Sequence, residues 1–553
     1  MKTAFHPRRV YIAASYMAPV GRYNGKEREA CTFLELAEKA AAVFASSPVR
    51  PRDIEAVVVG SQNPGAFSGV DNTAAKVAGV LGISGAKSVL IDTASSSGAS
   101  AFENAYMEIA SGRSDHVLAM GIQKMSDVST WMPPRLSPGS STGTRRSSAC
   151  PCLPAAHWCP VSHAAPESLR GGMDGLLGHA HRTAHRFAAR NPDAHLNFQI
   201  PVDEYYRQIV NGKNYMYWWP LRYHDFCPMS DGVAAVILTA RPQEVMVTGV
   251  GSATDIPTIA DRRYFQSFPA TVRAAAAAYG MAGIKDITTF AGKLHVNMHD
   301  PFNGFGPINM VDLGIIPRTR LLDGLFDDSL TGERGRFPTN LTGGLKGRGH
   351  PLGATGMIQV VENHRLILER GFQAGLSHSI GGPINNNVVI LLERVSHFRH
   401  RPCQPYKPWG LPSLGTLKPK QVTIDALLSG TETVEGSYVT STTRFDYKTG
   451  QPLNTLMLVS CRMNGGRYTF LFGIGGEHYQ SIASLAPGDR LSLERKDGLI
   501  LVNQMPVKRF YQRTLDGLME FAESGWRIFQ GKKVIQDKKK AEGEPTLCSG
   551  GAA

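Results

Sequence analysis

The sequence predicts an α/β fold made of two similar halves, followed by a small β-rich domain. Short apolar runs of strand length alternate with helical segments from Arg9 to Leu392. A loop of small residues followed by a helix and a strand occurs once in each half of that region. Beyond Pro419 the sequence changes to short β-like runs separated by glycine turns, which is typical of a small barrel or sandwich.

The first half alternates five predicted strands with four main helices. Strands are expected at Val10–Ala14, Ile54–Gly60, Ser88–Asp92, His116–Gly121 and, after a turn, within Cys227–Leu238. Helices are expected at Phe33–Phe44, Asn72–Leu81, Gly98–Ala110 and Leu176–Ala189. Thr32 is the predicted N-cap of the first helix. This alternation predicts parallel strands joined by helical crossovers.

The second half has the same layout. Strands are expected at Val245–Gly251, His295–Met298 and Asn387–Leu392, and helices at Ala270–Tyr279, Ile308–Leu313 and Met357–Glu369. The order loop, helix, strand in SSSGASAFENAYMEIASGRSDHVLAMG returns in GHPLGATGMIQVVENHRLILERGFQAGLSHS. The repetition predicts an internally duplicated architecture.

Residues 131–170 break the pattern, because they are crowded with Pro, Ser, Arg and Cys and show no periodicity. The segment contains Cys150, Cys152, His157, Cys159 and His163. Their spacing matches no standard zinc pattern, so we predict no metal site there. Two interpretations stay open: an unstructured insertion, or a shifted reading frame in the gene model.

The chain is expected to divide into five parts. These are a first half at 1–240, a second half at 241–396, a linker at 397–419, a β-rich and OB-like domain at 420–530, and a disordered lysine-rich tail at 531–553. The β-like runs of the fourth part are Val422–Leu427, Ser437–Thr442, Thr455–Ser460, Arg467–Phe472, Arg490–Leu493 and Leu499–Val502. A helix at Thr514–Ser524 closes it.

Composition narrows the class of protein. The 553 residues contain eight scattered cysteines, which favour reduced thiols over a disulfide framework. Neither a signal peptide nor an apolar run long enough to cross a membrane is present, so we expect a cytoplasmic protein without a membrane span. The net charge of +13 suits an anionic partner, but it is spread out and accompanies no nucleic-acid-binding motif. We therefore expect no nucleic-acid partner.

Four loops, each just after a predicted strand, carry the candidate chemistry: Asp92–Gly98, His299–Phe302, Asn340–Gly356 and His378–Pro383. The first is a tight strand-to-helix turn of small residues, a common place for a nucleophile and also an ordinary loop. In the third loop, six glycines surround one His-Pro. They bring backbone close to a ligand and present His350 at the base of a helix.

These loops resemble the thiolase superfamily, most closely the SCP2-type thiolases, over roughly Arg9–Arg394 apart from residues 131–170. The motif GGLKGRGHPLGATG is the most specific part of the match. The resemblance implies two α/β halves packed in five layers, a homodimer, and acyl-CoA as the substrate, with no permanently bound cofactor. OB-like domains accompany some thiolase-like proteins in larger assemblies.

The family uses a cysteine at a helix N-terminus to take the acyl group, and the histidine of the GHP loop activates it. A second cysteine moves the α-proton of the substrate, and histidine or asparagine side chains with backbone N–H groups form two oxyanion holes. Here the first cysteine position is Ser95, and the two places for the second are Pro301 and Ser379. Both thiols are therefore absent.

The candidate catalytic residues are His350, His299 and Ser95, with Gly381 and Ser379 beside an oxyanion hole. A helix end contributes about 0.3–1 kcal/mol to an anion, which is too little to ionise a hydroxyl. Ser95 would need His350 as a base, and Pro301 has no group that moves a proton.

These motifs and the resemblance lead to two alternative functional hypotheses. The first is a divergent thiolase-like acyltransferase or carbon–carbon bond enzyme acting on acyl-CoA in lipid metabolism. The alternative is a non-catalytic homologue that binds acyl-CoA or acts as a scaffold.

Overall fold

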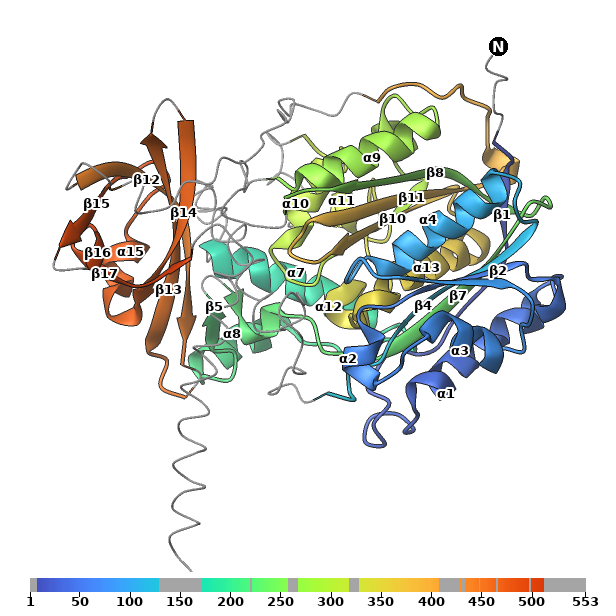
Figure 1. Ribbon diagram of the computed structural model, residues 1–553, viewed down its shortest axis with the longest axis horizontal. Coiled ribbons are helices and arrows are strands. Elements are labelled where there is room, and N and C mark those ends of the chain that lie inside the picture. The colour runs from blue at the N-terminus through green and yellow to red at the C-terminus, as the bar shows by residue number, and fades with distance from the viewer. Residues whose placement is uncertain are drawn as a thin grey trace, which may run out of the picture.

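The computed structural model describes residues 7–128, 172–218, 221–256, 267–317, 328–406, 428, 433–446, 448–463, 466–496 and 499–511. The segment 131–170, the run at 422–427, the helix at 514–524, the lysine-rich tail and most of the expected linker lie outside these residues. Figure 1 shows a large α/β body and a smaller β domain.

The α/β body is built on one sheet of nine strands. They are β1 (Val10–Met17), β2 (Ala56–Gly60), β3 (Lys87–Ile91), β4 (His116–Gln123), β7 (Gly232–Thr239), β8 (Val245–Thr254), β9 (Leu294–Asn297), β10 (Ala374–Gly381) and β11 (Asn386–Arg394). Their order is β3-β2-β4-β7-β1-β8-β11-β10-β9. The two halves meet where β1 pairs with β8, and the first half contributes five strands to the sheet and the second half four.

The sheet is mixed, so the prediction of parallel strands was wrong for its centre. Strand β2 pairs parallel with β3 and β4, and β9 pairs parallel with β10. The pairs β1–β7, β4–β7, β8–β11 and β10–β11 are antiparallel. The connection from β10 to β11 is too short for a crossover helix, which forces an antiparallel hairpin.

Helices cover both faces of each half. The main ones are α1 (Phe33–Glu38), η1 (Lys39–Ser46), α3 (Thr73–Val80), α4 (Ser97–Ala110), α9 (Pro269–Met281), α10 (Phe305–Asp312) and α13 (Thr355–Arg370). Shorter ones are α2 (Pro64–Ser68), α11 (Asp328–Thr331), α12 (Gly344–Arg348), η2 (Pro51–Asp53), η5 (Ile287–Phe290), η7 (Leu352–Ala354) and η8 (Val395–His397).

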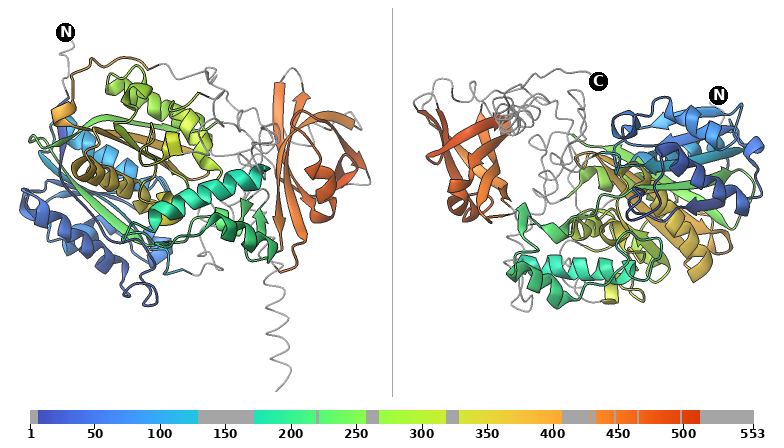
Figure 2. Two further views of the ribbon diagram at one scale, coloured as in Figure 1. Left: turned by 180° about the vertical axis from the view of Figure 1, so that it is seen from behind. Right: turned by 90° about the horizontal axis from the view of Figure 1, so that it is seen from below.

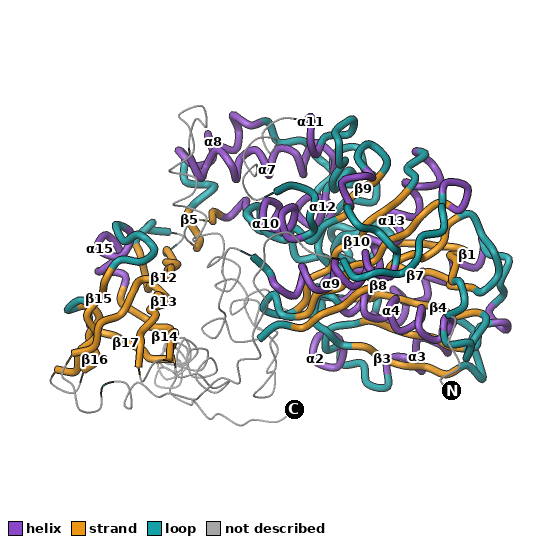
Figure 3. The backbone as a smooth tube through the Cα atoms, turned by 90° about the horizontal axis from the view of Figure 1, so that it is seen from above, coloured by secondary structure: helices purple, strands orange, loops and turns teal. Residues whose placement is uncertain are grey.

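Three apolar cores define five layers. The central core packs Phe102 of α4 and Val361 of α13 between strands of both halves. A second core packs α1, η1 and α3 on the outer face of the first half, and a third packs α9 and α10 on the outer face of the second. Figure 3 shows α4 and α13 lying among the strands. The duplicated five-layer prediction is therefore confirmed.

A small region inserted before β7 lies against the loop of α12. It comprises α7 (Gly172–Ala188), α8 (Val202–Val210), β5 (Met216–Trp218), β6 (Leu221–Arg222) and η3 (Tyr223–Asp225). A Cβ at Gly347 would stand 2.8 Å from the carbonyl oxygen of Ala184, so α7 and α12 are in direct backbone contact.

The C-terminal part forms a closed barrel. Its strands are β12 (Thr433–Phe445), β13 (Pro452–Met463), β14 (Gly466–Gly475), β15 (Arg490–Lys496), β16 (Leu499–Val502) and β17 (Met505–Tyr511), with η9 (Gly476–His478) and α15 (Tyr479–Ala483) after β14. Strand β12 pairs with both β13 and β15, which closes the ring β12-β13-β14-β17-β16-β15. The predicted small barrel is confirmed, and Figure 2 shows it as a separate lobe.

The hairpin of β5 and β6 extends the barrel sheet, because Trp218 pairs with Arg444 of β12. Within the described ranges, no helix is long and apolar enough to cross a membrane.

Candidate functional site

Ser95 lies in a strained turn between β3 and α4. Ala94, directly before it, has a φ of +57°, a conformation that few residues other than glycine adopt. Asp92 Oδ1 accepts a hydrogen bond from Ala94 N at 2.9 Å, and Ser97 Oγ donates to Ala94 O at 2.6 Å. These bonds hold the turn in a conformation that costs about 1–3 kcal/mol when unsupported, as is common at functional sites.

The amino-terminal ends of the two central helices meet beside this turn. A Cβ at Gly98 would stand 2.7 Å from the carbonyl oxygen of Gly353, and one at Gly356 would stand 2.6 Å from Ala99 N. A Cβ at Gly381 would stand 2.0 Å from the carbonyl oxygen of Thr93. Such contacts require glycine. Because both helix ends carry partial positive charge, the place where they meet favours an anion.

His350 is buried at the end of the glycine-rich loop, next to α13. Its Nδ1 lies 2.8 Å from Thr355 Oγ1, and that hydroxyl donates to the carbonyl oxygen of Pro351 at 3.2 Å. Since the only hydroxyl proton of Thr355 is used there, Nδ1 must carry the imidazole proton and Nε2 a free lone pair. Burial, with Arg348 as a second cause, lowers the pKa of His350 to about 3. The ring is therefore a neutral base at physiological pH.

His299 faces His350. The two rings are perpendicular, with centroids 5.1 Å apart. Nδ1 of His299 is buried and has no hydrogen-bond partner in the described part of the chain, and burial holds the pKa of the ring well below its usual value. Asn309 fixes the backbone by donating to the carbonyl oxygen of His299 at 2.6 Å. The site thus presents two neutral imidazoles to a ligand.

Cys227 lies beside the loop that follows His299, a neighbour that sequence reasoning missed. Its backbone N donates to the carbonyl oxygen of Pro301 at 2.9 Å. Burial raises the pKa of the Cys227 thiol to about 12, so the thiol stays protonated and unreactive at neutral pH. Burial also raises the pKa of Asp300 to about 7 and lowers that of Lys346 to about 8.

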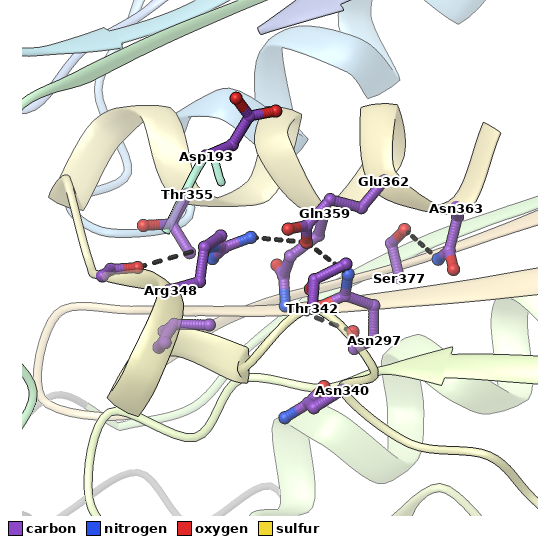
Figure 4. Close-up of polar contacts among 12 residues, drawn as sticks. Asp193, Asn297, Asn340, Thr342, Arg348, Thr355, Gln359, Glu362, Asn363 and Ser377 are labelled. Atoms are coloured by element: carbon purple, nitrogen blue, oxygen red, sulfur yellow. Dashed lines mark hydrogen bonds and ion pairs between the residues drawn. The ribbon is translucent and has the colours of Figure 1, made fainter. Parts of the chain in front are cut away.

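One face of α13 carries the polar side chains that support the site, as Figure 4 shows. Thr355 binds His350, and Gln359 Nε2 donates to the carbonyl oxygens of Asn297 at 3.1 Å and His378 at 2.9 Å. Glu362 pairs with Arg348 and Asn297. The sequence signal was the spacing of these residues along an otherwise buried helix.

The structure places the predicted residues in one region, and of these His299 and His350 are in ring contact. Ser95 is half-buried, and no hydrogen bond joins its hydroxyl to His350 in the described residues. Ser379 Oγ is buried and has no hydrogen-bond partner among the residues that the structure describes, and it lies 2.9 Å from where a Cβ of Gly356 would stand. Ser379 and Gly381 lie at the end of β10 and not in a loop, so the predicted loop at 378–383 was wrong over its first four residues.

The His378 ring contacts α9 and also lies near enough to His299 to help lower the pKa of that ring. Thr271 of α9 lies 3.1 Å from His378 Nε2, which places the imidazole on the outer face of the sheet. Across the described ranges, no group of three or more His, Cys, Asp or Glu side chains is arranged to hold a metal ion.

Comparison with known proteins identifies the family of this chain. Residues 10–158 match the thiolase N-terminal domain and residues 251–394 the thiolase C-terminal domain-like family. An acetyl-CoA acetyltransferase of Methanothermobacter thermautotrophicus is 30% identical over 371 residues, covering 63% of this chain and 90% of the relative. The chain belongs to the thiolase superfamily.

Solved structures extend the likeness of this thiolase-superfamily chain. A monomeric SCP2-thiolase like protein type 1 from Mycobacterium smegmatis aligns with a TM-score of 0.63 and 17% identity, covering 90% of this chain and 99% of that one. Residues up to 406 are under three quarters of the chain, so the alignment extends beyond the α/β body. An Ltp2-ChsH2(DUF35) aldolase aligns with a TM-score of 0.56 and 17% identity, covering 71% of this chain and all of that one.

Proposed function

We propose that this chain makes or breaks a carbon–carbon bond in an acyl-CoA thioester without forming an acyl-cysteine. The observation that carries the proposal is the buried pair of neutral histidines, His299 and His350, in a site where both thiol positions lack a thiol. Acyl transfer through cysteine needs a thiolate, whereas enolate chemistry needs a base and a hydrogen-bond donor. The site supplies the base and the hydrogen-bond donor that enolate chemistry needs.

The reaction can be written with these two side chains alone. His350 Nε2 takes the hydroxyl proton of a 3-hydroxyacyl-CoA, the Cα–Cβ bond breaks, and a carbonyl product leaves. The electron pair passes to the thioester as an enolate, whose oxygen His299 and the two helix ends stabilise. The enolate carbon then takes the proton from His350 and becomes acyl-CoA. The aldolase among the structural neighbours supports this class of reaction.

The thioester is the substrate, and no permanently bound cofactor is part of the proposal. Ser95 remains a candidate nucleophile for acyl transfer, with Ser379 and the backbone at Gly381 beside the oxyanion.

The four cysteines in the described ranges are free thiols, which supports a cytoplasmic location. Acyl-CoA of lipid metabolism is the proposed substrate pool.

The alternative function is acyl-CoA binding or scaffolding without catalysis. Two observations favour it: Pro301 replaces a proton-moving cysteine, and the hydroxyl of Ser95 has no bond to His350. The barrel would then be a docking module of a larger assembly.

The test is turnover by the purified chain. It is incubated with 3-hydroxyacyl-CoA, with 3-ketoacyl-CoA and with acetyl-CoA, and carbonyl product, acyl-CoA and free CoA are followed. Carbon–carbon cleavage should fall about 10²–10⁴-fold in His350→Ala, because the general base is lost. Ser95→Ala should retain it if no acyl-enzyme forms. Binding without turnover, unchanged in His350→Ala, would reject catalysis.

We also propose that the chain forms a homodimer through β3. This strand pairs only with β2 among the described strands, and Leu90 on it is exposed. The other edge strand of the sheet, β9, is fully buried. An open apolar edge is a ready site for pairing with a second copy.

A further inference from the structure

One carboxylate joins the two segments that carry the histidines of the site. Glu362 Oε2 accepts a hydrogen bond from Arg348 Nη1 at 2.6 Å and another from Asn297 Nδ2 at 2.7 Å. Arg348 lies two residues before His350, and Asn297 lies two residues before His299. Figure 4 shows Arg348, Glu362 and Asn297 connected in this order. Glu362 is therefore one link between the two loops, which also contact each other directly where Leu345 N donates to Asp300 Oδ1 at 2.7 Å.

All three side chains are removed from solvent. Arg348 and Asn297 are fully buried, and Glu362 is 3% exposed. The carboxylate projects from the middle of α13, which is packed in the central layer and cannot shift easily. Glu362 thus ties two loops to a helix of the central layer.

The ion pair is a poor device for stability. Arg348 Nη2 and Glu362 Oε1 are buried and have no hydrogen-bond partner within the described part of the chain. A buried pair repays its desolvation only when its remaining donors and acceptors are satisfied. Replacement of such pairs by apolar side chains is often neutral or stabilising. A gain in folding stability therefore does not explain this ion pair, whereas the need to hold the two loops in place does.

We propose that Glu362 is a positioning residue that sets the arrangement of His299 and His350 through Asn297 and Arg348. It touches neither substrate nor reacting atoms. The inference rests on the proposed function, because the arrangement matters only if the two imidazoles act together on an enolate.

The test compares two ligands, and it needs no turnover. One ligand is CoA, and the other is nitroethyl-CoA, a CoA thioether whose planar nitronate anion resembles an enolate in shape and charge. Their dissociation constants are measured by titration calorimetry for the full chain and for Glu362→Gln. We expect the preference for the nitronate to fall by roughly 10²-fold, the loss that a displacement of about 1 Å can cause. CoA binding should change less than about twofold.

Two further variants separate positioning from folding. Asn363→Leu is the matched control, since Asn363 is the next residue of α13 and equally buried but binds His295 and Ser377 instead. It should keep the nitronate preference. The double variant Arg348→Met with Glu362→Met should melt no lower than the original chain and still lose the preference.

The outcomes distinguish the two proposals. If the original chain prefers the nitronate and Glu362→Gln keeps that preference, the positioning role is wrong and the proposed function stands. If the double variant melts as the original does and keeps the preference, the positioning role is again overturned. If the original chain binds nitroethyl-CoA no more tightly than CoA, both proposals are rejected.

Discussion

Ser95 occupies a turn suited to a nucleophile but supplies a hydroxyl in place of a thiol. The positive φ of Ala94 and the adjoining end of α4 are features of the backbone, so they do not depend on the side chain at position 95. A thiol at a helix N-terminus ionises readily, because its pKa starts near 8.5 and falls there. A hydroxyl does not. The turn and the side chain in it therefore have separable roles.

Ser95→Cys should acquire an acyl group from acetyl-CoA. The thiolate would attack the thioester carbonyl, CoA would leave as the thiol, and the acetyl group would remain on sulfur. Peptide mass spectrometry after incubation with acetyl-CoA detects the adduct. The original chain and Ser95→Cys with His350→Ala are the controls, and both should stay unmodified. An unmodified Ser95→Cys would show that the turn does not meet the thioester.

The sequence pointed to single residues where a motif spans a short stretch. His350 was selected from one glycine-rich loop, and the structure places it beside His299, while the catalytic roles of both stay predictions. The ion pair of Arg348 and Glu362 was not predicted, because it joins the end of α12 to a residue two turns into α13. Cys227 was missed as a neighbour of Pro301 for the same reason: their contact depends on tertiary structure.

The turn before α4 lies in close backbone contact with strand β10. Gly381 of β10 should not tolerate a side chain, since a Cβ there would lie 2.0 Å from the carbonyl oxygen of Thr93 and 2.4 Å from Ser96 Oγ. Gly381→Ala should therefore lower the free energy of unfolding by about 1–3 kcal/mol or more, through displacement of the turn.

The matched control is Gly79→Ala in α3. A Cβ at Gly79 meets nothing within 4 Å, so alanine should raise the free energy of unfolding by about 0.5–1 kcal/mol through its better helix propensity. Urea denaturation measures both variants. Equal stability of the two would mean that β10 and the turn are not packed as described.

Element type was predictable, whereas element ends and pairing were less so. The strand at 54–60 and the helix at 98–110 correspond to β2 and α4 within two residues. The helix expected at 33–44 ends at Glu38 and continues as the 3₁₀ helix η1. The run at 374–381 was expected to be a loop at its end because Ser, His and Gly are weak strand formers, yet burial between β9 and β11 makes it a strand.

At the scale of the whole molecule, acid should destabilise the fold from about pH 6.5 downward. Burial lowers the pKa of His295, His364 and His378 to about 4 and that of His350 to about 3. Below pH 6.5 the unfolded chain binds protons at these positions and the folded chain does not. Each histidine thus removes about 1.4 kcal/mol of unfolding free energy per pH unit until its folded pKa is reached.

Urea denaturation at pH 8, 6.5 and 5 measures this loss. Asp225 and Asp300 act in the opposite direction, because burial raises the pKa of their carboxyls to about 6 and 7, and the folded state holds their protons more tightly. The histidines outnumber them, so stability should fall on acidification. An unfolding free energy that is constant from pH 8 to 5 would contradict the burial of these rings.

The open edge of the sheet predicts the oligomeric state. Leu90→Lys places a charge on the exposed edge strand and should convert a dimer into a monomer. Sedimentation velocity measures the mass. Val210→Lys in α8 is the control, since Val210 is 88% exposed and far from β3 in sequence, and it should leave the dimer intact. A monomeric original chain would contradict pairing through β3.

The position of β1 has a consequence for synthesis. In β1, Tyr11 pairs with Thr239, and Val10 pairs with Val247. At about 5–20 residues per second, on the order of 10–50 s pass between the translation of β1 and that of its two neighbours. During that time the nascent chain holds an apolar strand with both edges unpaired. The ribosome must therefore release nearly half of the chain, through the end of β8 at Thr254, before the centre of the sheet can form, and chaperone binding should be strongest in this interval.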